Sequence, residues 1–423
     1  MKLSPGAKVV LILFALSMFG GIVTGAQFYY RIGYFWAFLF IGSWLWSLTA
    51  LRGLRLQRKE RTLRAQVGQI FEERFEVDNP NSLPRFLVNV RDESPLPGSQ
   101  GSRVFPIIER KLGRSYLVRT QLVQRGVFPL GPTVLESGDP FGLFPVERII
   151  KPEESLMVYP MMIDIRTFPT PPGIIPGGEA LRRRTVQVTP NAAGVRDYAP
   201  GDPLNRIHWL STARRGRLIA KEFELDPQAD VWVFLDAEKA SNVSSKKKIT
   251  FTDNDERDAL WRVPKEISLP PATEEYGVSI AASLCRYYLR KGRSVGFASA
   301  GQSVTVLPPD KGGRQLAKIL ESLALIRAEG KLPLPGLIRA QVQHLARGTT
   351  VVLVTASVEQ EIALAVDLLI RRGLRPLVVL IDAASFGGIS GTGVLEQMLL
   401  MMNVIVRTVK NGDTLEVILP GNG

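Results

Sequence analysis

The stretch DVWVFLDA, residues 230–237, determines the fold class of the C-terminal half of this chain. It is an almost continuous apolar run that ends in a carboxylate. Such runs are typical of central strands in parallel sheets, where both faces of the strand are buried. We therefore predict that residues 230–237 form a central strand of an α/β domain.

Segments of strand and helix character alternate from this stretch to the end of the chain. Strands are predicted over 294–300, 303–309, 349–356, 375–382 and 403–410, and helices over 274–292, 313–329, 338–348, 359–373 and 393–402. Strands that alternate with helices imply right-handed crossovers and an open α/β sheet. Ligands of such sheets bind at the carboxyl ends of the strands, so Asp236 and Asp382, which both end strands, are candidate site residues.

Two uncharged apolar runs lie near the N-terminus. Residues 9–30 and residues 32–51 contain no charged side chain. About 20 apolar residues cross the hydrocarbon core of a bilayer as a helix, so each run is long enough to span it. The first run, with Lys2 and Lys8 beside it, also fits a signal peptide, but the second run a few residues later favours a transmembrane hairpin.

Basic residues flank the hairpin and predict its orientation. Only Arg31 lies between the two runs, whereas six basic residues follow the second run: Arg52, Arg55, Arg58, Lys59, Arg61 and Arg64. Because Lys and Arg are enriched on the cytoplasmic side of spans, we predict a cell-membrane protein with both termini in the cytoplasm. The same residues would contact anionic lipid headgroups, at about 1 kcal/mol each. Nucleic-acid binding is the alternative use of these charges, but their position beside the membrane accounts for them, and we expect no nucleic-acid partner.

Short alternating runs occupy residues 65–160. Four of them alternate apolar and polar side chains, as strands with one buried face do: QIFEERFEVDN, RFLVNVRDE, RSYLVRTQLVQRGVF and FPVERIIK. Turn-forming stretches separate them, and no helical periodicity interrupts them. We predict a small antiparallel β-sandwich or barrel, in which Asp139 caps a turn.

The chain is thus organised in four parts. Residues 1–64 form a transmembrane hairpin with a basic juxtamembrane segment, and 65–160 form a β-rich module. Residues 161–227 connect this module to the α/β domain at 228–423. A polar, lysine-rich stretch over about residues 241–273 is interpreted as an insertion in the α/β domain.

The connector contains GVRDYAPGDPLNRIHWLSTARRGRLIAKEFE, residues 194–224, which we call the signature segment. Pro200 and Gly201 predict a turn, and Asp202 is placed to cap a helix that begins near Leu204 and contains Trp209. The basic stretch that follows the helix predicts a strand that leads into the α/β domain.

Five charged side chains of the signature segment can satisfy one another as an ion-pair network: Arg196, Asp197, Asp202, Arg206 and Arg214. Such a network would make the segment a structural clasp between the β-rich module and the α/β domain, which is the interpretation that we prefer. The alternative is a docking surface or an anion pocket around the three arginines, because the guanidinium fork suits carboxylate and phosphate groups.

The signature segment resembles the defining sequence of the bacterial domain-of-unknown-function 58 family. The matching residues are Arg196, Asp197, Tyr198, Pro200, Gly201, Asp202, Arg206, Trp209 and Arg214. Three further stretches agree in order: RGVFPLGPTVLESGDPFGLF at 125–144, MVYPMM at 157–162 and SIAASLCRYYLRKGRSVGFAS at 279–299. The likeness runs from about residue 65 to at least residue 300, and an N-terminal hairpin is usual in the family.

The resemblance implies that the α/β domain is similar to a von Willebrand factor A domain and that the partner is a MoxR-type AAA+ ATPase. Domains of that kind often bind Mg²⁺ through an Asp-x-Ser-x-Ser motif. The corresponding positions here are Asp236, Glu238 and Ala240, so the motif is degenerate. Glu238 can still offer a carboxylate oxygen, and Ser241 or Thr355 can add a hydroxyl. We prefer a loop-capping role for Asp236 and expect no cofactor, with Mg²⁺ as the alternative.

Residues and motifs for catalysis are few. His208 and His344 are the two histidines, and the single cysteine, Cys285, lies in an apolar run that predicts a buried, inert thiol and permits no internal disulfide. No G-x-x-x-x-G-K-[ST], H-E-x-x-H or G-x-S-x-G motif occurs in the sequence. We therefore predict a membrane-anchored, non-enzymatic interaction protein. The alternatives are a metal-dependent adhesion or binding protein and an enzyme that uses the charged residues 196–214.

Overall fold

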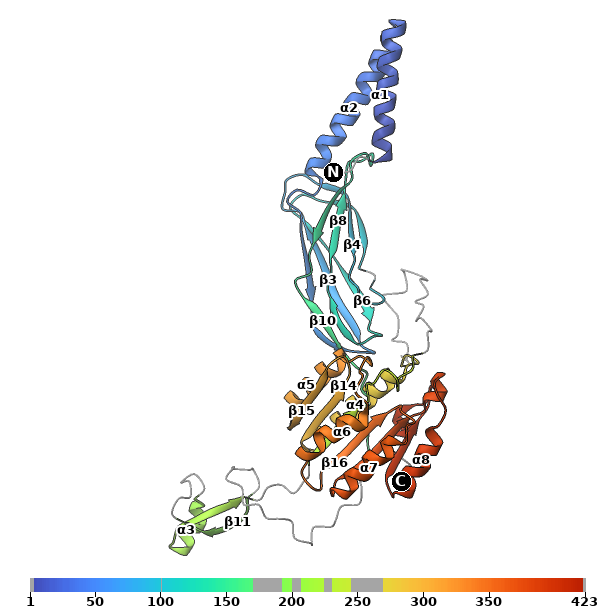
Figure 1. Cartoon of the computed structure of the whole chain (residues 1–423). Helices are drawn as coiled ribbons and strands as arrows, with labels where there is room; N and C mark the ends of the chain where they lie inside the picture. The colour runs from blue at the N-terminus through green and yellow to red at the C-terminus, as the bar shows by residue number, and fades with distance from the viewer. Residues whose placement is uncertain are drawn as a thin grey trace. The chain divides into compact units, whose positions relative to one another are not determined.

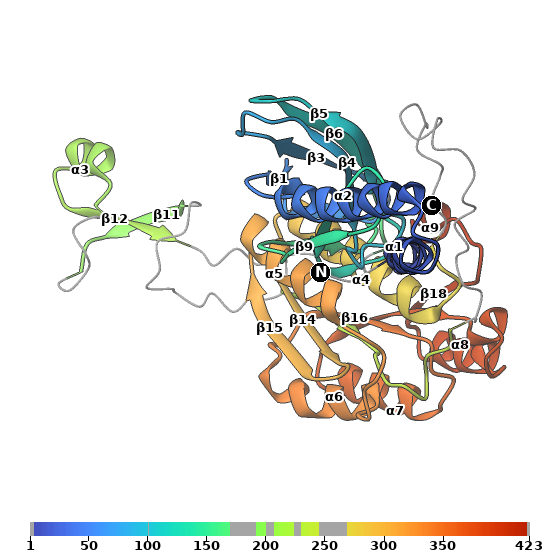
Figure 2. The same cartoon turned by 90° about the horizontal axis from the view of Figure 1, so that it is seen from above.

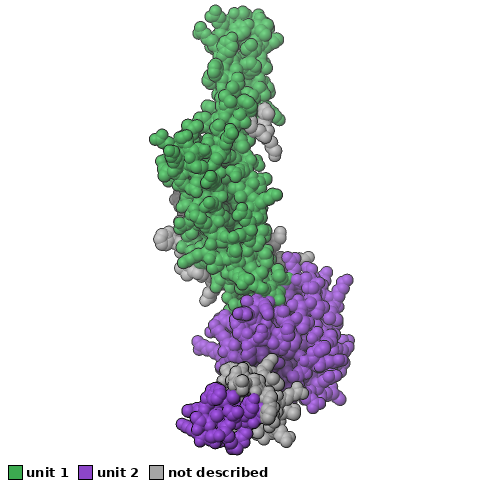
Figure 3. Space-filling view, turned by 90° about the vertical axis from the view of Figure 1, so that its left-hand side faces the viewer, with its two compact units in different colours: residues 1–162, 246–270, 320–325 green, residues 163–245, 271–319, 326–423 purple. Residues whose placement is uncertain are grey.

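The computed structural model describes residues 4–99, 101–169, 192–199, 207–223, 230–244 and 269–420. Contacts divide the chain into two compact units, one formed chiefly by residues up to Met162 and the other chiefly by residues from Ile163 onward (Figure 3). The predicted insertion at 241–273 lies mostly outside the described residues. Its two ends are described, and Ser244 forms a strand-like bridge with Ala272 there.

Two long apolar helices begin the first unit (Figure 1). α1 spans Pro5–Thr24 and α2 spans Gln27–Ala50, and both are long and apolar enough to cross a membrane. The Ser4 hydroxyl caps α1 by accepting a hydrogen bond from the N–H of Ala7 at 3.2 Å. Pro5 at the first helical position needs no such partner, because it has no N–H group.

The turn between these helices lies at Gly25 and Ala26, earlier than the sequence predicted. The predicted spans placed Arg31 in the loop, and this was wrong because Arg31 lies inside α2. Gly25 adopts a φ of 67°, a conformation that favours glycine, so it ends α1 although the residues that follow are still uncharged. Tyr29 of α2 then packs over Gly20 of α1, where the missing side chain leaves room for the ring.

Among the described residues between Arg55 and Tyr159, ten strands form three sheets. The sheet orders are β1-β3-β6, β5-β4-β8-β9 and β2-β10-β7, and every pairing is antiparallel except that of β2 with β10. The prediction of a sheet-rich module is confirmed, and the predicted antiparallel pairing holds for all of these strand pairs except β2 with β10. The strands are β1 (Arg55–Glu60), β2 (Arg64–Gln66), β3 (Ile70–Asp78), β4 (Arg85–Asp92), β5 (Arg103–Ile108), β6 (Gly113–Gln121), β7 (Gly126–Pro129), β8 (Thr133–Ser137), β9 (Val146–Ile150) and β10 (Ser155–Tyr159).

Alternate side chains of the first two sheets form a shared core. Phe75 and Val77 of β3 belong to the same buried cluster as Val88 and Val90 of β4 and Leu135 of β8. The period of two that marks these strands in the sequence therefore turns one face of each sheet inward. Two sheets that bury their apolar faces against each other form a sandwich.

The β-rich module starts at Arg55, before the predicted boundary at residue 65. Part of the predicted basic juxtamembrane segment is therefore strand β1 of the module. Arg58 lies 2.6 Å from Glu73, and Lys59 lies 2.6 Å from Glu76, because β1 pairs with β3 and brings their side chains together. At least two of the six basic residues therefore have carboxylate partners within the module.

The predicted turn cap at Asp139 is confirmed. Its buried carboxylate accepts hydrogen bonds from the N–H groups of Phe141 at 3.0 Å and Phe144 at 2.7 Å. The turn directs Leu143 and Phe144 toward the two helices, where the ring of Phe144 lies 5.0 Å from that of Phe40. The helical hairpin and the β-rich module therefore share an apolar contact.

A six-stranded sheet forms the centre of the second unit, in the order β15-β14-β13-β16-β17-β18. All pairings are parallel except that of β14 with β15. The predicted α/β sheet is confirmed, whereas the antiparallel edge strand and α9 were not predicted. The elements are β13 (Val231–Leu235), α4 (Thr273–Arg290), β14 (Val295–Ala300), β15 (Val304–Asp310), α5 (Gly313–Leu325), α6 (Leu334–Gln341), β16 (Thr350–Thr355), α7 (Glu361–Arg371), β17 (Arg375–Ile381), α8 (Thr392–Met401), β18 (Ile405–Val409) and α9 (Leu415–Ile418).

Helices cover both faces of this sheet (Figure 2). On one face, Phe234 of β13 belongs to a buried cluster that includes residues of α6, α7 and α8. On the other face, Leu235 and Val354 approach Gly277 of α4. Every residue of β13 is buried, which explains why residues 231–235 are apolar at successive positions.

Candidate functional site

The strand order places a topological switch point between β13 and β16. The chain leaves β13 toward β14 on one side, and it leaves β16 toward β17 on the other side. The two loops therefore diverge at the carboxyl ends of these strands, which is where open α/β sheets bind ligands. Asp236 follows β13 at this point, and Thr355 ends β16.

Asp236 is buried and holds two hydrogen bonds at the switch point. Its Oδ2 accepts from the Thr355 hydroxyl at 2.6 Å, and its Oδ1 accepts from the N–H of Glu238 at 3.1 Å. Burial raises the pKa of Asp236 to about 6, although both hydrogen bonds oppose that rise. The predicted loop-capping role is confirmed, because the carboxylate closes the turn that begins after β13.

The loop after Asp236 is held by further polar contacts. The Ser241 hydroxyl donates to Glu238 Oε2 at 3.1 Å, and the Asn242 side-chain amide donates to the carbonyl of Glu238 at 2.9 Å. We call Asp236, Glu238, Ser241 and Thr355 the switch-point cluster. The structure thus brings together the four side chains that the degenerate motif suggested, although Thr355 is 119 residues from Asp236 in the chain.

Gly330 supports this loop through its backbone. Its N–H donates to the carbonyl of Ala237 at 3.0 Å, and its carbonyl accepts from the N–H of Lys239 at 2.9 Å. A Cβ atom at Gly330 would lie 2.0 Å from the carbonyl oxygen of Ala300, so only glycine fits. Gly330 was not predicted as a site residue, because a glycine in a loop carries no signal in the sequence of what approaches it.

The switch-point cluster offers only oxygen donors, which are the donors that Mg²⁺ prefers. Glu238 is partly exposed and Asp236 is buried, so two carboxylates and two hydroxyls are available. Asp382 follows β17 at the same edge of the sheet, where its Oδ1 accepts from the Thr392 hydroxyl at 3.0 Å. Within the described ranges, however, no group of three or more His, Cys, Asp or Glu side chains is placed to hold a metal ion. The donor chemistry fits a hard cation, and the number of charged ligands is low.

The Asp236→Asn variant is expected to remove a pH dependence of stability from the second unit. The pKa of Asp236 is about 6 in the folded protein and 3.8 ordinarily, so the folded state holds this proton more tightly than the unfolded state. The resulting contribution to stability is fully present below the ordinary pKa of 3.8 and is lost as the pH rises through about 6. As the pH rises through this window, the unfolding temperature of the full-length chain should therefore decline more steeply for the wild type than for the variant.

The matched control for this measurement is Asp367→Asn. Asp367 is partly exposed and pairs with Arg371 at 2.6 Å on the surface of α7. Its replacement should therefore leave the dependence of the unfolding temperature on pH as it is in the wild type. Parallel pH profiles for the wild type and Asp236→Asn would contradict the assignment of the slope to Asp236.

A second candidate site is the part of the signature segment that the structure describes. β11 (Ala192–Asp197) pairs with β12 (Ile219–Phe223) in an antiparallel ribbon, and α3 (Trp209–Arg215) lies between them in the chain. The strand after the helix was predicted, whereas β11 was not. The side chain of Arg196 and all of Pro200, Gly201, Asp202 and Arg206 lie outside the description, so their predicted roles stay predictions.

The helix of the signature segment begins later than predicted. Ile207 forms a strand-like bridge with Ala220, and His208 caps α3 by accepting from the N–H of Ser211 at 3.3 Å. The predicted start near Leu204 was therefore wrong, because residue 207 is extended and Trp209 is the first residue of the helix. His208 acts as a cap here, where its ring nitrogen replaces the usual side-chain oxygen.

Large apolar side chains are exposed on this helix. Trp209 is 66% exposed and Leu210 is 61% exposed, and Arg214 and Arg215 follow them in the last turn. Asp197 Oδ2 lies 3.0 Å from Arg217 Nη1, a partner that the predicted ion-pair network did not include. Tyr198 is half-buried, and its N–H donates to the carbonyl of Leu218.

The other residues weighed for catalysis do not come together. Cys285 is fully buried in α4, as predicted, and burial raises the pKa of its thiol. His344 is exposed in a short 3₁₀ turn after α6, and the ring of His208 lies 2.7 Å from the Ser211 hydroxyl in the N-terminal cap of α3. A Cys–His pair therefore does not form between these residues.

Comparison with known proteins places the signature segment in a family. Residues 194–254 match the model of DUF58, described as a protein of unknown function. The uncharacterized protein YeaD of Bacillus subtilis (strain 168) is 23% identical over 320 residues, which cover 74% of this chain and 70% of that protein. Two crystal forms of proximal thread matrix protein 1 from the mussel byssus are 13% and 14% identical, with TM-scores of 0.29 and 0.30. The matches cover 46% and 45% of this chain, and less than half of that protein's length, 46% in each case. The chain is therefore similar to DUF58 proteins over residues 194–254, and it is similar to YeaD over 74% of its length.

Proposed function

We propose that this chain is a membrane-anchored interaction protein and that its partner is an AAA+ ATPase of the MoxR type. The observation that carries the proposal is the exposure of Trp209 and Leu210 on α3, within the segment that matches the family model. Tryptophan is enriched among residues that dominate the free energy of protein–protein binding. A tryptophan that is exposed at the start of a short helix is suited to insert into a partner's pocket.

Charge beside the apolar pair adds specificity to this surface. Arg214 and Arg215 lie exposed in the last turn of α3, and Arg217 follows them. Arginine forks bind carboxylates through two parallel hydrogen bonds, so an acidic partner surface is expected around the pocket that receives Trp209. We therefore infer that the described part of the signature segment acts as a docking surface, in preference to the clasp favoured by the sequence alone.

Anchoring in the membrane is supported by α1 and α2, which are long and apolar enough to span a bilayer. The basic residues on both sides of the hairpin support the orientation in which both units lie in the cytoplasm. A cytoplasmic location would give the docking surface access to an ATPase. Protease accessibility in intact cells and in inverted vesicles would test this orientation.

Trp209→Ala is expected to weaken capture of the ATPase by roughly thirtyfold, since loss of a binding hot spot costs about 2 kcal/mol or more. The measurement is affinity isolation of the full-length chain from gently solubilised native membranes, with the ATPase identified in the eluate. Because the side chain is 66% exposed, the variant should keep the wild-type unfolding temperature.

The matched control for Trp209→Ala is Leu364→Ala, which removes an apolar side chain that is 63% exposed on α7. Unchanged capture with a lowered unfolding temperature for Trp209→Ala would support the clasp instead of the docking surface. Absence of any AAA+ ATPase from the wild-type eluate would contradict the proposed partner.

A second candidate function is metal-dependent binding at the switch-point cluster, in a domain similar to a von Willebrand factor A domain. The specific support is the placement of Asp236, Glu238, Ser241 and Thr355 at one carboxyl edge. If Mg²⁺ binds there, it should raise the unfolding temperature of the wild type above pH 6, where Asp236 is ionised, and it should not raise that of Asp236→Asn. An equal effect of Mg²⁺ on both proteins would remove this candidate.

A further inference from the structure

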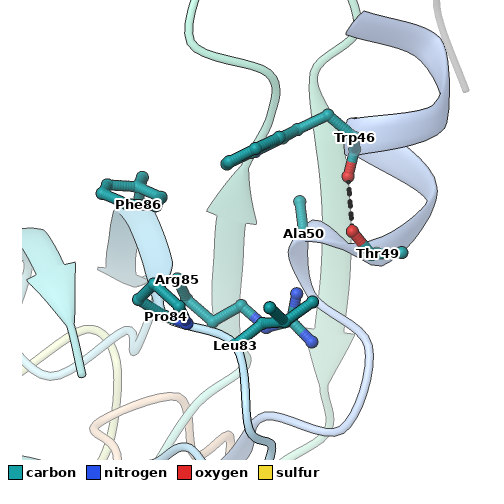
Figure 4. Close-up of a pocket in the computed structure, with 7 residues that line it drawn as sticks. All are labelled: Trp46, Thr49, Ala50, Leu83, Pro84, Arg85 and Phe86. Atoms are coloured by element: carbon teal, nitrogen blue, oxygen red, sulfur yellow. Dashed lines mark hydrogen bonds between the residues drawn. The ribbon is translucent and has the colours of Figure 1, made fainter. Parts of the chain in front are cut away.

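A small cavity lies where α2 ends against the β-rich module (Figure 4). It has a volume of about 110 Å³ and is lined by residues of the last turns of α2 and of the segment that leads into β4: Trp46, Thr49, Ala50, Leu83, Pro84, Arg85 and Phe86. Trp46 lies on one side of the cavity, and Arg85 and Leu83 lie on the opposite side. The rings of Trp46 and Phe86 are 5.7 Å apart. Apolar walls thus surround a single cationic side chain.

Arg85 is almost completely buried, with 7% of its surface exposed. Its Nη2 donates to the carbonyl of Arg52 at 3.0 Å, whereas its buried Nε has no hydrogen-bond partner among the residues that the structure describes. A buried, charged donor without an acceptor is costly. The chemistry of the site therefore calls for an anionic oxygen, and Arg is the side chain that binds phosphate best.

Two loops extend this site into a surface at the end of the module. Asn79 joins them, because its side-chain amide donates to the carbonyls of Leu83 at 2.8 Å and Glu109 at 3.1 Å. The N–H of Lys111 donates to the carbonyl of Asn81 at 3.1 Å. Residues 79–85 and 109–112 therefore lie side by side next to the end of α2. We call this surface the proximal tip.

The proximal tip combines exposed leucines with basic residues. Leu83 is 62% exposed and Leu112 is 54% exposed, and the exposed Arg110 and Lys111 lie next to Leu112. The one carboxylate in these two loops, Glu109, lies 3.7 Å from Arg114. Apolar side chains flanked by cations are the composition of surfaces that enter the headgroup region of anionic membranes.

The length of α2 places this surface at the bilayer interface. A helix of 24 residues is about 36 Å long, whereas the hydrocarbon core is about 30 Å thick. If α2 spans the bilayer and its excess length lies at its C-terminal end, the last turn, which begins near Trp46, would lie among the headgroups, where tryptophan is enriched. The cavity that these turns line is then level with lipid phosphates.

We propose that the proximal tip binds an anionic phospholipid, with Leu83 and Leu112 in the interface and the headgroup phosphate at Arg85. The proposal rests on the membrane anchoring proposed above and deepens it by naming a lipid class. It also differs from the prediction of lipid contacts for residues 52–64, because two basic residues of that stretch pair with Glu73 and Glu76. In the present proposal the lipid contacts are made by residues 79–85 and 109–112, which lie outside that basic stretch.

Native mass spectrometry of the full-length chain in detergent, with phosphatidylglycerol or phosphatidylcholine added, tests the proposal. The wild type is expected to retain phosphatidylglycerol about tenfold better than phosphatidylcholine. Arg85→Gln should abolish that preference. Leu83→Asp should also abolish it, and this variant does not depend on the buried guanidinium for folding, because the leucine is exposed. Arg314→Gln and Leu364→Asp change exposed residues of the second unit and should keep the preference.

Equal retention of the two lipids by the wild type would overturn the proposal, as would an unchanged preference in both Arg85→Gln and Leu83→Asp. If inorganic phosphate displaces phosphatidylglycerol and raises the unfolding temperature as much as the lipid does, the ligand is free phosphate and the lipid assignment is wrong. Alkaline washing of native membranes distinguishes a chain that lacks the lipid preference from a chain that is not anchored in the membrane. A chain that stays in washed membranes without lipid preference overturns only the present inference, whereas a chain that is released overturns the anchoring.

Discussion

Replacement of Arg58 with alanine is expected to destabilise the β-rich module by about 3–5 kcal/mol, the usual cost of removing one partner from a buried ion pair. Arg58 Nη2 lies 2.6 Å from Glu73 Oε2, and Arg58 Nη1 lies 3.1 Å from Asp92 Oδ1. The Glu73 side chain is 0% exposed and that of Asp92 is 1% exposed. Without Arg58, two carboxylates would face each other inside the sandwich without a cation.

The electrostatic environment of Glu73 supports this expectation. Burial raises the pKa of Glu73, Arg58 opposes the rise, and the charge of Asp92 adds to it. In Arg58→Ala the opposing charge is gone, so the pKa of Glu73 should rise further. Since a raised pKa in the folded state favours the protonated form, the variant should recover part of its stability as the pH falls.

Lys59→Ala is the matched control for Arg58→Ala. Lys59 is the next residue of the same strand and also lies 2.6 Å from a glutamate, but its side chain is 58% exposed. Exposed ion pairs contribute about 0–1 kcal/mol, so this variant should be close to the wild type. Hydrogen exchange of peptides from β1, β3 and β6 in the full-length chain would report the local free energy of opening. Similar exchange in Arg58→Ala and Lys59→Ala would show that burial does not decide the strength of these pairs.

Replacement of Gly330 with alanine should cost about 3 kcal/mol or more, because the added methyl group has no space that side-chain motion can supply. The Cβ atom would meet the carbonyl oxygens of Ala300 at 2.0 Å and Ala237 at 2.8 Å. Both contacts are with backbone atoms, so the loop that carries Asp236 and Glu238 must move. The variant should therefore lose both stability and the hydrogen bonds that shape the switch-point cluster.

Gly393→Ala is expected to change the stability in the opposite direction, and it serves as the control for Gly330→Ala. Gly393 lies near the start of α8, and a Cβ atom there would meet nothing within 4 Å. Alanine favours a helix over glycine by up to about 1 kcal/mol, so this variant should be slightly more stable than the wild type. Unfolding temperatures of both variants test the pair, and a stable Gly330→Ala would mean that the loop after β13 is more plastic than its contacts indicate.

Local patterns in the sequence determined the fold class of the second unit. The apolar run at 230–237, the amphipathic helix ended by Gly292 and the later alternation of strands and helices all correspond to described elements. Such patterns are reliable because a buried strand or an amphipathic helix depends on its own residues and on one apolar surface. The same reasoning identified the buried Cys285 and the turn cap at Asp139.

Boundaries that depend on one residue's conformation were less well determined. Gly25 ends α1 because it adopts a positive φ, while the surrounding residues remain uncharged on both sides. Ile207 is extended because it forms a bridge with Ala220, a partner thirteen positions later in the chain. In both cases a backbone conformation or a distant partner sets the boundary, and the periodicity of the sequence contains no signal for either.

By itself, the sequence determined that this protein has two apolar spans, a β-rich module, an α/β sheet and a DUF58 signature. Only the tertiary structure decided which charges are used internally and which face outward. Arg58 lies in the sandwich because β1 pairs with β3, and Asp236 meets Thr355 because β13 and β16 are neighbours. Strand pairing joins residues that are far apart in the chain, and no local pattern identifies which charged side chains such pairing buries.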